Sequence, residues 1–250
     1  MKDILLLDYD HTLYPSTLST LRAVDDRINL YIRTFLGFTS GQADALRLEL
    51  WDKYGTTLKG LEDLHGVDRE HYCDFIHAIE AAHLPPPDPA LQAWLTAMPH
   101  PCYLFTNARM DWPVRGLKAM GLEALLPQAM ASQGNTGDTL GGFPVPAGMG
   151  VAPDGFRGER LLGIFDIAFM DLEGKPNPPG YAKVDARLRE RHGHDLRIHF
   201  ADDRPDNLES ARERGWRTIW IVPHTAAPVS GNEFDRVVSS LTELDPVRLS

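Results

Sequence analysis

The sequence is poor in cysteine, in basic residues and in long apolar runs, and each scarcity excludes a class of protein. Its 250 residues include two cysteines, Cys73 and Cys102, which lie far apart and outside any C-x-x-C pattern. We therefore expect no disulfide framework and a reducing, cytoplasmic location. The first ten residues contain an apolar run of only four, between Asp3 and Asp8. This run is too short for a signal peptide, and no later segment is long enough to span a bilayer.

The charge balance is acidic, with 35 aspartates and glutamates against 25 lysines and arginines and a formal net charge of -10. Such a balance argues against a nucleic-acid backbone or an anionic membrane as the partner. A small anionic substrate stays possible, because a metal ion and a few local cations can reverse the potential inside one pocket. The sequence does not indicate an oligomeric state.

Short apolar runs predict the fold class. Each run is continuous rather than alternating, which is typical of strands in a sheet covered on both faces. The predicted strands are residues 4–7, 102–105, 167–170, 198–201 and 218–222. Helical patterns follow the later runs, at residues 112–120, 181–191 and 205–214. Alternation of strand and helix predicts an α/β fold with a doubly wound parallel sheet.

The region between the first two predicted strands has a helical pattern instead. We expect a small helical cap domain, residues 17–89, inserted after the first strand and acting as a lid on a core of residues 1–16 and 90–250. Trp51, Tyr54 and Trp94 are expected in the core of this lid rather than in a platform for base stacking.

A second departure from the pattern is the glycine- and proline-rich stretch 127–160. It is either a surface excursion or a functional flap or subunit contact.

Polar residues follow four of the five predicted strands directly, namely Asp8, Thr106, Asp171 and Asp202. In parallel α/β sheets the ligand site lies at the carboxyl ends of the strands, so these residues are expected to converge. Asp8 and Asp10 are two residues apart in extended chain, so both carboxylates point the same way. One carboxylate can attack phosphorus and the other can transfer a proton. Taken alone, such a pair is equally typical of a solvated turn.

Three further clusters strengthen the pattern. Thr106 and Asn107 offer a hydroxyl and backbone N–H groups suited to phosphate oxygens. Lys175, fixed before Pro176, can neutralise a phosphoryl group, and the adjacent acids Asp202 and Asp203 are hard oxygen ligands for Mg²⁺. Each cluster has a structural explanation, as a turn, a surface lysine or a helix cap. All four clusters fall in order at the ends of strands of one predicted sheet, and chance agreement of all four would be rare.

The chain resembles the haloacid dehalogenase superfamily of phosphohydrolases, and within it the pyrimidine 5′-nucleotidase-like group. The stretches that carry the resemblance are LLLDYDHTLYP (5–15), YGTTLKGL (54–61), YLFTNARMDWPVRGLKAMGL (103–122), GIFDIAFMDLEGKPNPPGY (163–181) and HFADDRPDNLESARERGW (199–216). They cover nearly the whole chain apart from 127–160.

The resemblance implies roles for the matching residues. Asp8 would be the nucleophile and a Mg²⁺ ligand. Asp10 would be the general acid and base, with its backbone carbonyl on the metal. Lys175 would stabilise the aspartyl-phosphate. The remaining implied site residues are Thr106 and Asn107 for the phosphoryl oxygens, Thr12 for orienting the first loop, and Asp203 with Asp202 for Mg²⁺. His11 stands where the family usually has asparagine, at what we expect to be a turn position.

The implied activity is a Mg²⁺-dependent phosphomonoesterase acting on a small phosphorylated metabolite such as a nucleoside 5′-monophosphate. A phosphatase for phosphoglycolate or sugar phosphates is the nearest alternative. A hydrolytic dehalogenase would usually lack the second acid, here Asp10, and a non-catalytic binding protein would be expected to have lost one of the aspartates or the lysine. Tyr14, Arg109 and Arg204 adjoin the motifs and are further candidates for substrate contact. The histidines His65, His71 and His77 do not have the spacing of a zinc site with Cys73.

Overall fold

The computed structural model describes residues 1–126, 161–222 and 234–249, and its described strands form one parallel sheet of six. The strand order is β3-β2-β1-β4-β5-β6, and every neighbouring pair is parallel. The strands are β1 (Lys2–Leu7), β2 (Cys102–Phe105), β3 (Leu161–Phe165), β4 (Leu196–Asp202), β5 (Arg217–Ile221) and β6 (Arg236–Val238). The predicted doubly wound parallel sheet is thereby confirmed.

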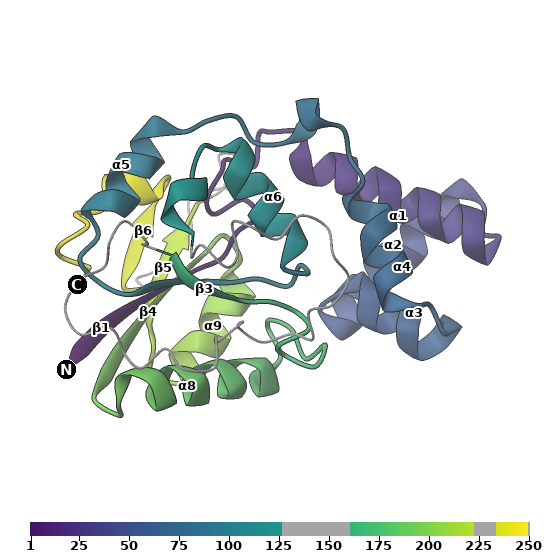
Figure 1. Ribbon diagram of the computed structural model, residues 1–250. Coiled ribbons are helices and arrows are strands. Elements are labelled where there is room, and N and C mark those ends of the chain that lie inside the picture. Colours follow the sequence, from purple (N-terminus) through teal and green to yellow (C-terminus); the bar gives the residue numbers. More distant parts are fainter. Residues whose placement is uncertain (127–160, 223–233, 250) are drawn as a thin grey trace, which may run out of the picture. The chain divides into compact units, whose positions relative to one another are not determined.

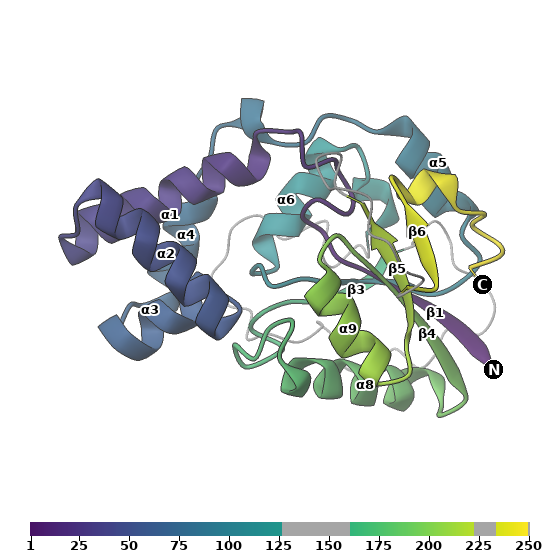
Figure 2. The same ribbon diagram turned by 180° about the vertical axis from the view of Figure 1, so that it is seen from behind.

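Helices cover both faces of this sheet, α5 and α6 on one side and α8 and α9 on the other (Figure 1; Figure 2 gives the view from behind). Their bounds are α5 (Pro89–Ala97), α6 (Asp111–Ala119), α8 (Pro178–His192) and α9 (Pro205–Glu213). The short 3₁₀ turns are η2 (Glu123–Leu125) and η3 (Leu241–Glu243). Cover on both faces explains why β1, β2 and β3 contain continuous apolar runs, because the residues of these runs are buried on both sides of the sheet.

Strand register brings the polar ends of the strands together. In the central strand β1, Leu7 lies opposite Leu104 of β2 and Ala201 of β4. The next residue along β1, Asp8, is therefore level with the next residue along β4, Asp202. The carboxyl ends of parallel strands share one edge of the sheet, and that edge is where the candidate site must lie.

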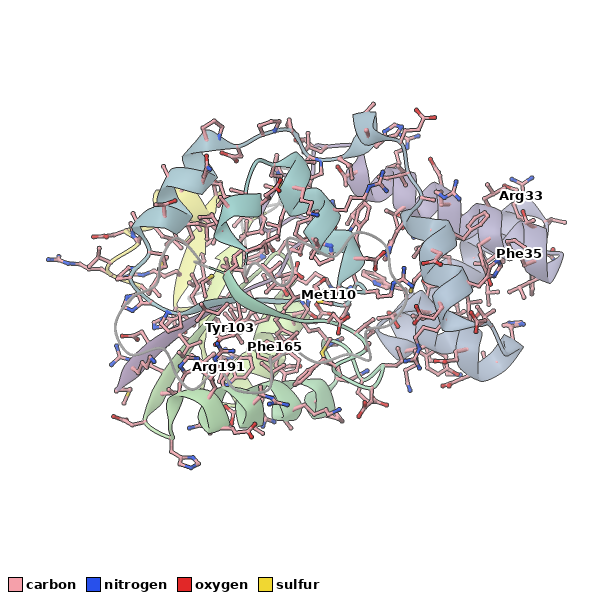
Figure 3. The ribbon with its side chains drawn as sticks, viewed as in Figure 1. Arg33, Phe35, Tyr103, Met110, Phe165 and Arg191 are labelled. Atoms are coloured by element: carbon pink, nitrogen blue, oxygen red, sulfur yellow. The ribbon has the colours of Figure 1, made fainter. Side chains whose placement is uncertain are left out.

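The face of the sheet under α8 is packed with aromatic rings. Figure 3 shows Tyr103 of β2 and Phe165 of β3 side by side with Arg191 of α8 close by. The two rings are stacked at 5.4 Å, and the Arg191 guanidinium lies 5.8 Å from the centre of the Tyr103 ring. The Tyr103 hydroxyl is 2.7 Å from Nε2 of His192, whose Nδ1 is 3.0 Å from the Lys2 ammonium. These contacts attach the last turn of α8 to the sheet.

The chain divides into two compact units, one of Met1–Ser16 with Pro86–Ser250 and the other of Thr17–Pro85. The second unit is helical, with α1 (Thr20–Leu36), α2 (Ser40–Tyr54), α3 (Thr57–His65), α4 (Arg69–His77) and the 3₁₀ turn η1 (Ala81–His83). Side-chain caps mark the starts of α3 and α4, since Thr56 accepts from Lys59 N–H and Asp68 accepts from His71 N–H. Such caps satisfy backbone donors that have no partner within the helix.

Aromatic side chains pack between α1 and α4 within this helical unit. The Tyr31 ring lies 4.7 Å from Phe35, 5.0 Å from Tyr72 and 5.4 Å from Phe75. The Tyr31 hydroxyl is 3.0 Å from Nδ1 of His71. The apolar face that the sequence shows in α1 is buried here, with Val24 and Ile32 among its buried residues.

Two tryptophans do not lie where the sequence predicted. Trp51 was expected in the core of the helical insert, but its side chain is 45% exposed. Trp94 lies on α5, outside the helical unit, and its indole N–H donates to Leu244 C=O at 2.8 Å. The helical pattern runs on from the insert into α5, so periodicity alone could not separate the two.

One predicted strand is wrong and one strand was missed. Residues 167–170 form a turn, and the strand is β3, which ends just before Asp166. Two apolar runs flank Asp166, and propensity does not distinguish them. As a result the polar residue after β3 is Asp166, while Asp171 lies in a turn with φ 53°. The short strand β6 has an exposed, weakly apolar sequence that gave no signal.

The predicted insertion at 127–160 lies outside the described residues. None of the described helices is both long and apolar enough to cross a membrane.

Candidate active site

The first loop of the site follows β1. The Asp8 N–H donates to Ala201 C=O at 2.9 Å, which extends the β1–β4 pairing by one residue and fixes the start of the loop. The chain then turns, with Leu13 N–H donating to Tyr9 C=O, and Thr12 Oγ1 donates to Asp8 Oδ2 at 3.3 Å. His11 has φ 60°, a left-handed conformation that asparagine and histidine adopt more readily than most residues. A histidine at this position thus suits the backbone.

Lys175 lies between two buried carboxylates. Its ammonium donates to Asp8 Oδ1 and to Asp202 Oδ2, both at 2.7 Å, and its side chain is only 2% exposed. Burial alone would lower the pKa of Lys175, but the adjacent carboxylates of Asp202 and Asp8 outweigh it and raise that pKa. Lys175 is therefore a permanent cation at this edge of the sheet.

The backbone of Lys175 is held by the side chain of Asn107. Asn107 Nδ2 donates to Lys175 C=O and Asn107 Oδ1 accepts from Lys175 N–H, both at 2.7 Å. Gly174 permits this contact, because a Cβ there would lie 2.6 Å from Asn107 Oδ1 and 2.7 Å from Ile167 Cδ1. The amide side chain of Asn107 is thus bound to the lysine loop.

Asp202 is the most enclosed acid of the site, with no exposed surface. Besides Lys175, it accepts from the Arg204 N–H at 2.8 Å and from Asn207 Nδ2 at 3.0 Å on each oxygen. Two donors on each oxygen occupy the usual acceptor capacity of a carboxylate. Burial raises the pKa of Asp202 to about 7, with Lys175 opposing the shift and Asp8 adding to it.

Asp8 and Asp203 complete a carboxylate cluster with Asp202. One ligand atom from each of the three lies within 4.8 Å of the others, and within the described ranges this is the group of side chains suited to a metal ion. Burial raises the pKa of Asp8 to about 6, Lys175 opposes the shift, and the charges of Asp203 and Asp10 add to it. The charges of this cluster repel one another and favour a divalent cation with oxygen ligands.

Asp203 faces the turn after β1. His11 Nδ1 lies 3.6 Å from Asp203 Oδ2, and the indole N–H of Trp220 donates to the Asp203 backbone carbonyl at 3.0 Å. Burial would lower the pKa of His11, but the neighbouring carboxylates, Asp203 foremost, outweigh it and raise that pKa.

Asp10 has a different environment from the other acids. Tyr14 Oη and Trp112 Nε1 both donate to the same oxygen, Asp10 Oδ1, with the indole at 3.0 Å. Burial raises the pKa of Asp10, and these two hydrogen bonds oppose the shift. The Asp10 carboxyl is not part of the three-carboxylate cluster. It is therefore oriented separately from the acids that could hold a metal.

Thr106 and Asp166 terminate the neighbouring strands. Thr106 is buried, its N–H donates to Phe165 C=O at 3.0 Å, and its Oγ1 accepts from the Ala108 N–H at 3.1 Å. Asp166 accepts from the N–H groups of Met110 and Phe169 at 3.0 and 2.8 Å. Asp166 therefore joins the start of α6 to the turn after β3, a role that the misplaced strand concealed.

Arg109 and Arg204, which the sequence offered as candidates for substrate contact, are hydrogen-bonded to neighbouring acids. Arg109 makes two hydrogen bonds to Asp111, at 2.6 and 3.0 Å, and Arg204 Nε lies 3.0 Å from Asp206 Oδ1. Each arginine is paired with the acid two residues further along, at the start of a helix.

The structure thus brings six of the predicted site residues together. Asp8, Asp202 and Asp203 form the carboxylate cluster, Lys175 binds Asp8 and Asp202, Thr12 binds Asp8, and Asn107 binds the backbone of Lys175. Sequence reasoning missed Trp112 and Asn207. Both lie within the motif stretches, but only tertiary contacts show which acid each one binds.

No protein-family model matches the chain. Solved structures that share its architecture include an L-2-haloacid dehalogenase (13% identity, 96% of each chain, TM-score 0.51). YfnB from Bacillus subtilis, described as a HAD hydrolase and bound to magnesium, matches at 15% identity over 97% of this chain and 96% of that chain, TM-score 0.51. A Bacteroides fragilis protein described as haloacid dehalogenase-like matches at 14% identity over 97% and 99%, TM-score 0.54.

The chain has the haloacid dehalogenase fold. At these identities the likeness concerns the fold, which also agrees with the parallel sheet order and the helical unit after β1. The haloacid dehalogenase fold hosts more than one chemistry, so function has to be argued from the site.

Proposed function

We propose that this protein is a phosphomonoesterase that works through a phosphorylated Asp8. The observation that supports this most directly is the position of Lys175, whose ammonium bridges Asp8 and Asp202 at 2.7 Å beside Asp203. A buried cation next to a buried carboxylate lets a dianionic phosphate approach an anionic nucleophile, because it offsets charge that would otherwise repel.

In the first step an oxygen of Asp8 attacks phosphorus and the bond from phosphorus to the ester oxygen breaks. The leaving alkoxide takes a proton from the Asp10 carboxyl, so a neutral alcohol departs and Asp10 becomes a carboxylate. Lys175 and the Thr12 hydroxyl, both on Asp8 in the structure, hold the nucleophile in place.

In the second step water attacks the phosphorus of the aspartyl-phosphate. The Asp10 carboxylate accepts the proton of that water, the bond between phosphorus and the Asp8 oxygen breaks, and inorganic phosphate leaves. Asp10 is then protonated and Asp8 ionised, as at the start, so the cycle balances. Thr106 and the backbone after it would bind phosphoryl oxygens in both steps.

The acids present fit Mg²⁺. Their donor set is hard carboxylate oxygen, which Mg²⁺ prefers, and the magnesium-bound YfnB structure shares the fold. Asp8 and Asp203 would be its direct ligands, because Asp202 already receives two donors on each oxygen. The backbone carbonyl of Asp10 would complete the protein ligands. When bound, the ion would neutralise phosphoryl charge as it develops.

The substrate in this proposal is a small phosphorylated metabolite, with nucleoside 5′-monophosphates as the first class to test. The helical unit Thr17–Pro85, inserted between β1 and β2, would be the cap domain that the resemblance implies. Phosphoglycolate and sugar phosphates form the alternative class.

The test is phosphate release from a panel of these esters, with Mg²⁺ and after EDTA, by wild type and by Asp8→Asn. We expect Mg²⁺-dependent release by wild type and none by the variant. Release that survives Asp8→Asn would reject the mechanism, and a panel with no response to nucleotides would move the assignment to the sugar phosphates or phosphoglycolate.

Two alternatives are tested in the same preparation. A hydrolytic dehalogenase would release halide from a 2-haloacid after EDTA, and would need no counterpart of Asp10. A non-catalytic binding protein would fail to bind trifluoroberyllate with Mg²⁺, a mimic of phosphate on Asp8, in an isothermal titration.

A further inference from the structure

Two donors from different parts of the chain meet on one oxygen of Asp10. Tyr14 comes from the loop after β1, and Trp112 from the first turn of α6. Both donate to Oδ1 of Asp10, while none of the described residues donates to Oδ2. An indole N–H can only donate, so Oδ1 acts as an acceptor in this arrangement.

This arrangement distinguishes the two oxygens of the carboxyl group. A protonated carboxyl has one carbonyl oxygen and one hydroxyl, and the oxygen that accepts two hydrogen bonds is the carbonyl. The proton of the acid then resides on Oδ2. The donors therefore decide which oxygen can give a proton to a leaving group.

Packing fixes both donors. Trp112 is 2% exposed and Tyr14 is 3% exposed. The Tyr14 and Tyr9 rings pack edge to face with their centroids 5.4 Å apart. The Tyr9 hydroxyl lies against Gly116 of α6, where a Cβ would come 1.4 Å from its oxygen. Neither donor can rotate away from Asp10 without displacing this packed layer.

We propose that Tyr14 and Trp112 are positioning residues that clamp Asp10 Oδ1 and present Oδ2 as the proton-transferring atom. The inference rests on the proposed function and adds to it the two residues that aim the acid. Their effect is confined to proton transfer. Attack by Asp8 on phosphorus, and binding of the phosphoryl group by Lys175 and Thr106, do not require them.

The leaving group provides the test. A p-nitrophenolate leaves without a proton, whereas the alkoxide of an alkyl phosphate needs one. The value of kcat/KM reports the steps up to departure of the leaving group. If Asp10 is no longer held in position, kcat/KM should therefore fall for alkyl phosphates only. General acid catalysis contributes about 10²- to 10⁴-fold, so we expect Tyr14→Phe and Trp112→Phe each to lower alkyl kcat/KM by about 10-fold or more. The loss for p-nitrophenyl phosphate should stay within about 3-fold.

Matched controls separate this effect from a loss of packing. Tyr103→Phe removes another buried, hydrogen-bonded tyrosine hydroxyl, and Trp94→Phe removes another buried indole that donates to a carbonyl. Neither control should change the ratio of the two kcat/KM values. Tyr14→Phe and Trp112→Phe should also bind trifluoroberyllate with Mg²⁺ as wild type does, because Asp8 and Lys175 are intact.

Equal losses of kcat/KM on both substrates, or a changed ratio in the controls, would refute the positioning role of Tyr14 and Trp112 without contradicting the proposed phosphatase activity. If wild type releases no phosphate by way of Asp8, both the proposed function and the positioning role of Tyr14 and Trp112 are refuted. Trp112→Phe keeps the inference testable if Tyr14→Phe does not fold, since each donor alone predicts the same selective loss.

Discussion

Replacing Lys175 by methionine removes the cation from between two buried carboxylates. Lys175→Met keeps most of the side-chain volume but leaves Asp8 and Asp202, each 2.7 Å from the ammonium, without their shared partner. Removing one partner of a buried ion pair destabilises a protein by about 3–5 kcal/mol. The variant can limit that cost by binding a proton on one carboxylate.

The proton uptake makes the destabilisation depend on pH. Lys175 holds down the pKa values of Asp8 and Asp202, so its removal raises both further. A carboxyl whose folded pKa exceeds its unfolded value stabilises the fold at low pH and loses that contribution as pH rises toward the folded pKa. In wild type, Asp8 and Asp202 already bind protons below their pKa values of about 6 and about 7, so the extra proton uptake of the variant grows between pH 5 and pH 7. Lys175→Met should therefore lose about 1–2 kcal/mol more stability at pH 7 than at pH 5.

Urea unfolding at pH 5, 6, 7 and 8 in EDTA measures this difference. Lys183→Met is the control, because Lys183 binds Phe169 C=O and Asp171 at the exposed surface. The control should lose less than about 1 kcal/mol, with no trend in pH. A loss for Lys175→Met that is the same at every pH, or below about 1 kcal/mol at pH 7, would refute the account of Lys175 as the neutralising cation.

Three further predictions concern the surroundings of the site and the sheet. Gly174→Ala places a Cβ 2.6 Å from Asn107 Oδ1, so it should displace the loop that carries Lys175. We expect kcat to fall by about 10-fold or more and the fold to lose about 1–3 kcal/mol of stability. Steady-state kinetics and thermal unfolding measure the two effects, and an unchanged kcat would contradict the role of Asn107. Tyr9→Phe removes a buried hydroxyl that has no hydrogen-bond partner among the described residues, so Tm should stay level or rise; a clear fall in Tm would mean that the hydroxyl is satisfied. Burial, with the Lys2 cation nearby, lowers the pKa of His192 to about 4, so the wild type should lose stability as pH falls from 6.5 toward 4. His192→Gln should lose about 1–3 kcal/mol less over that window in urea titrations, a difference reduced by partial exposure, and parallel curves would exclude His192 as the cause.

The sequence was sufficient for the sheet wherever an apolar run had a single interpretation. The runs at 4–7 and 102–105 became β1 and β2 because strands covered on both faces need uninterrupted apolar residues. It failed at β3, where apolar segments flank Asp166 on both sides and only pairing with β2 selects the first of them. It also failed at Trp94, since a helical period does not say which unit a helix packs against.

Residue types and their order along the chain predicted that Asp8, Asp202, Asp203 and Lys175 would gather at the strand ends, because parallel strands bring their carboxyl ends to one edge. The expectation was wrong for Asp171, which lies in a turn beyond the end of β3. The role of each contact came only from the folded chain. No spacing rule places Trp112 and Tyr14 on the same oxygen of Asp10, or turns the Asn107 amide toward the Lys175 backbone. A hydrogen bond requires its donor and acceptor to be placed to within a few tenths of an ångström, and packing sets that placement for these partners, which are up to 102 residues apart.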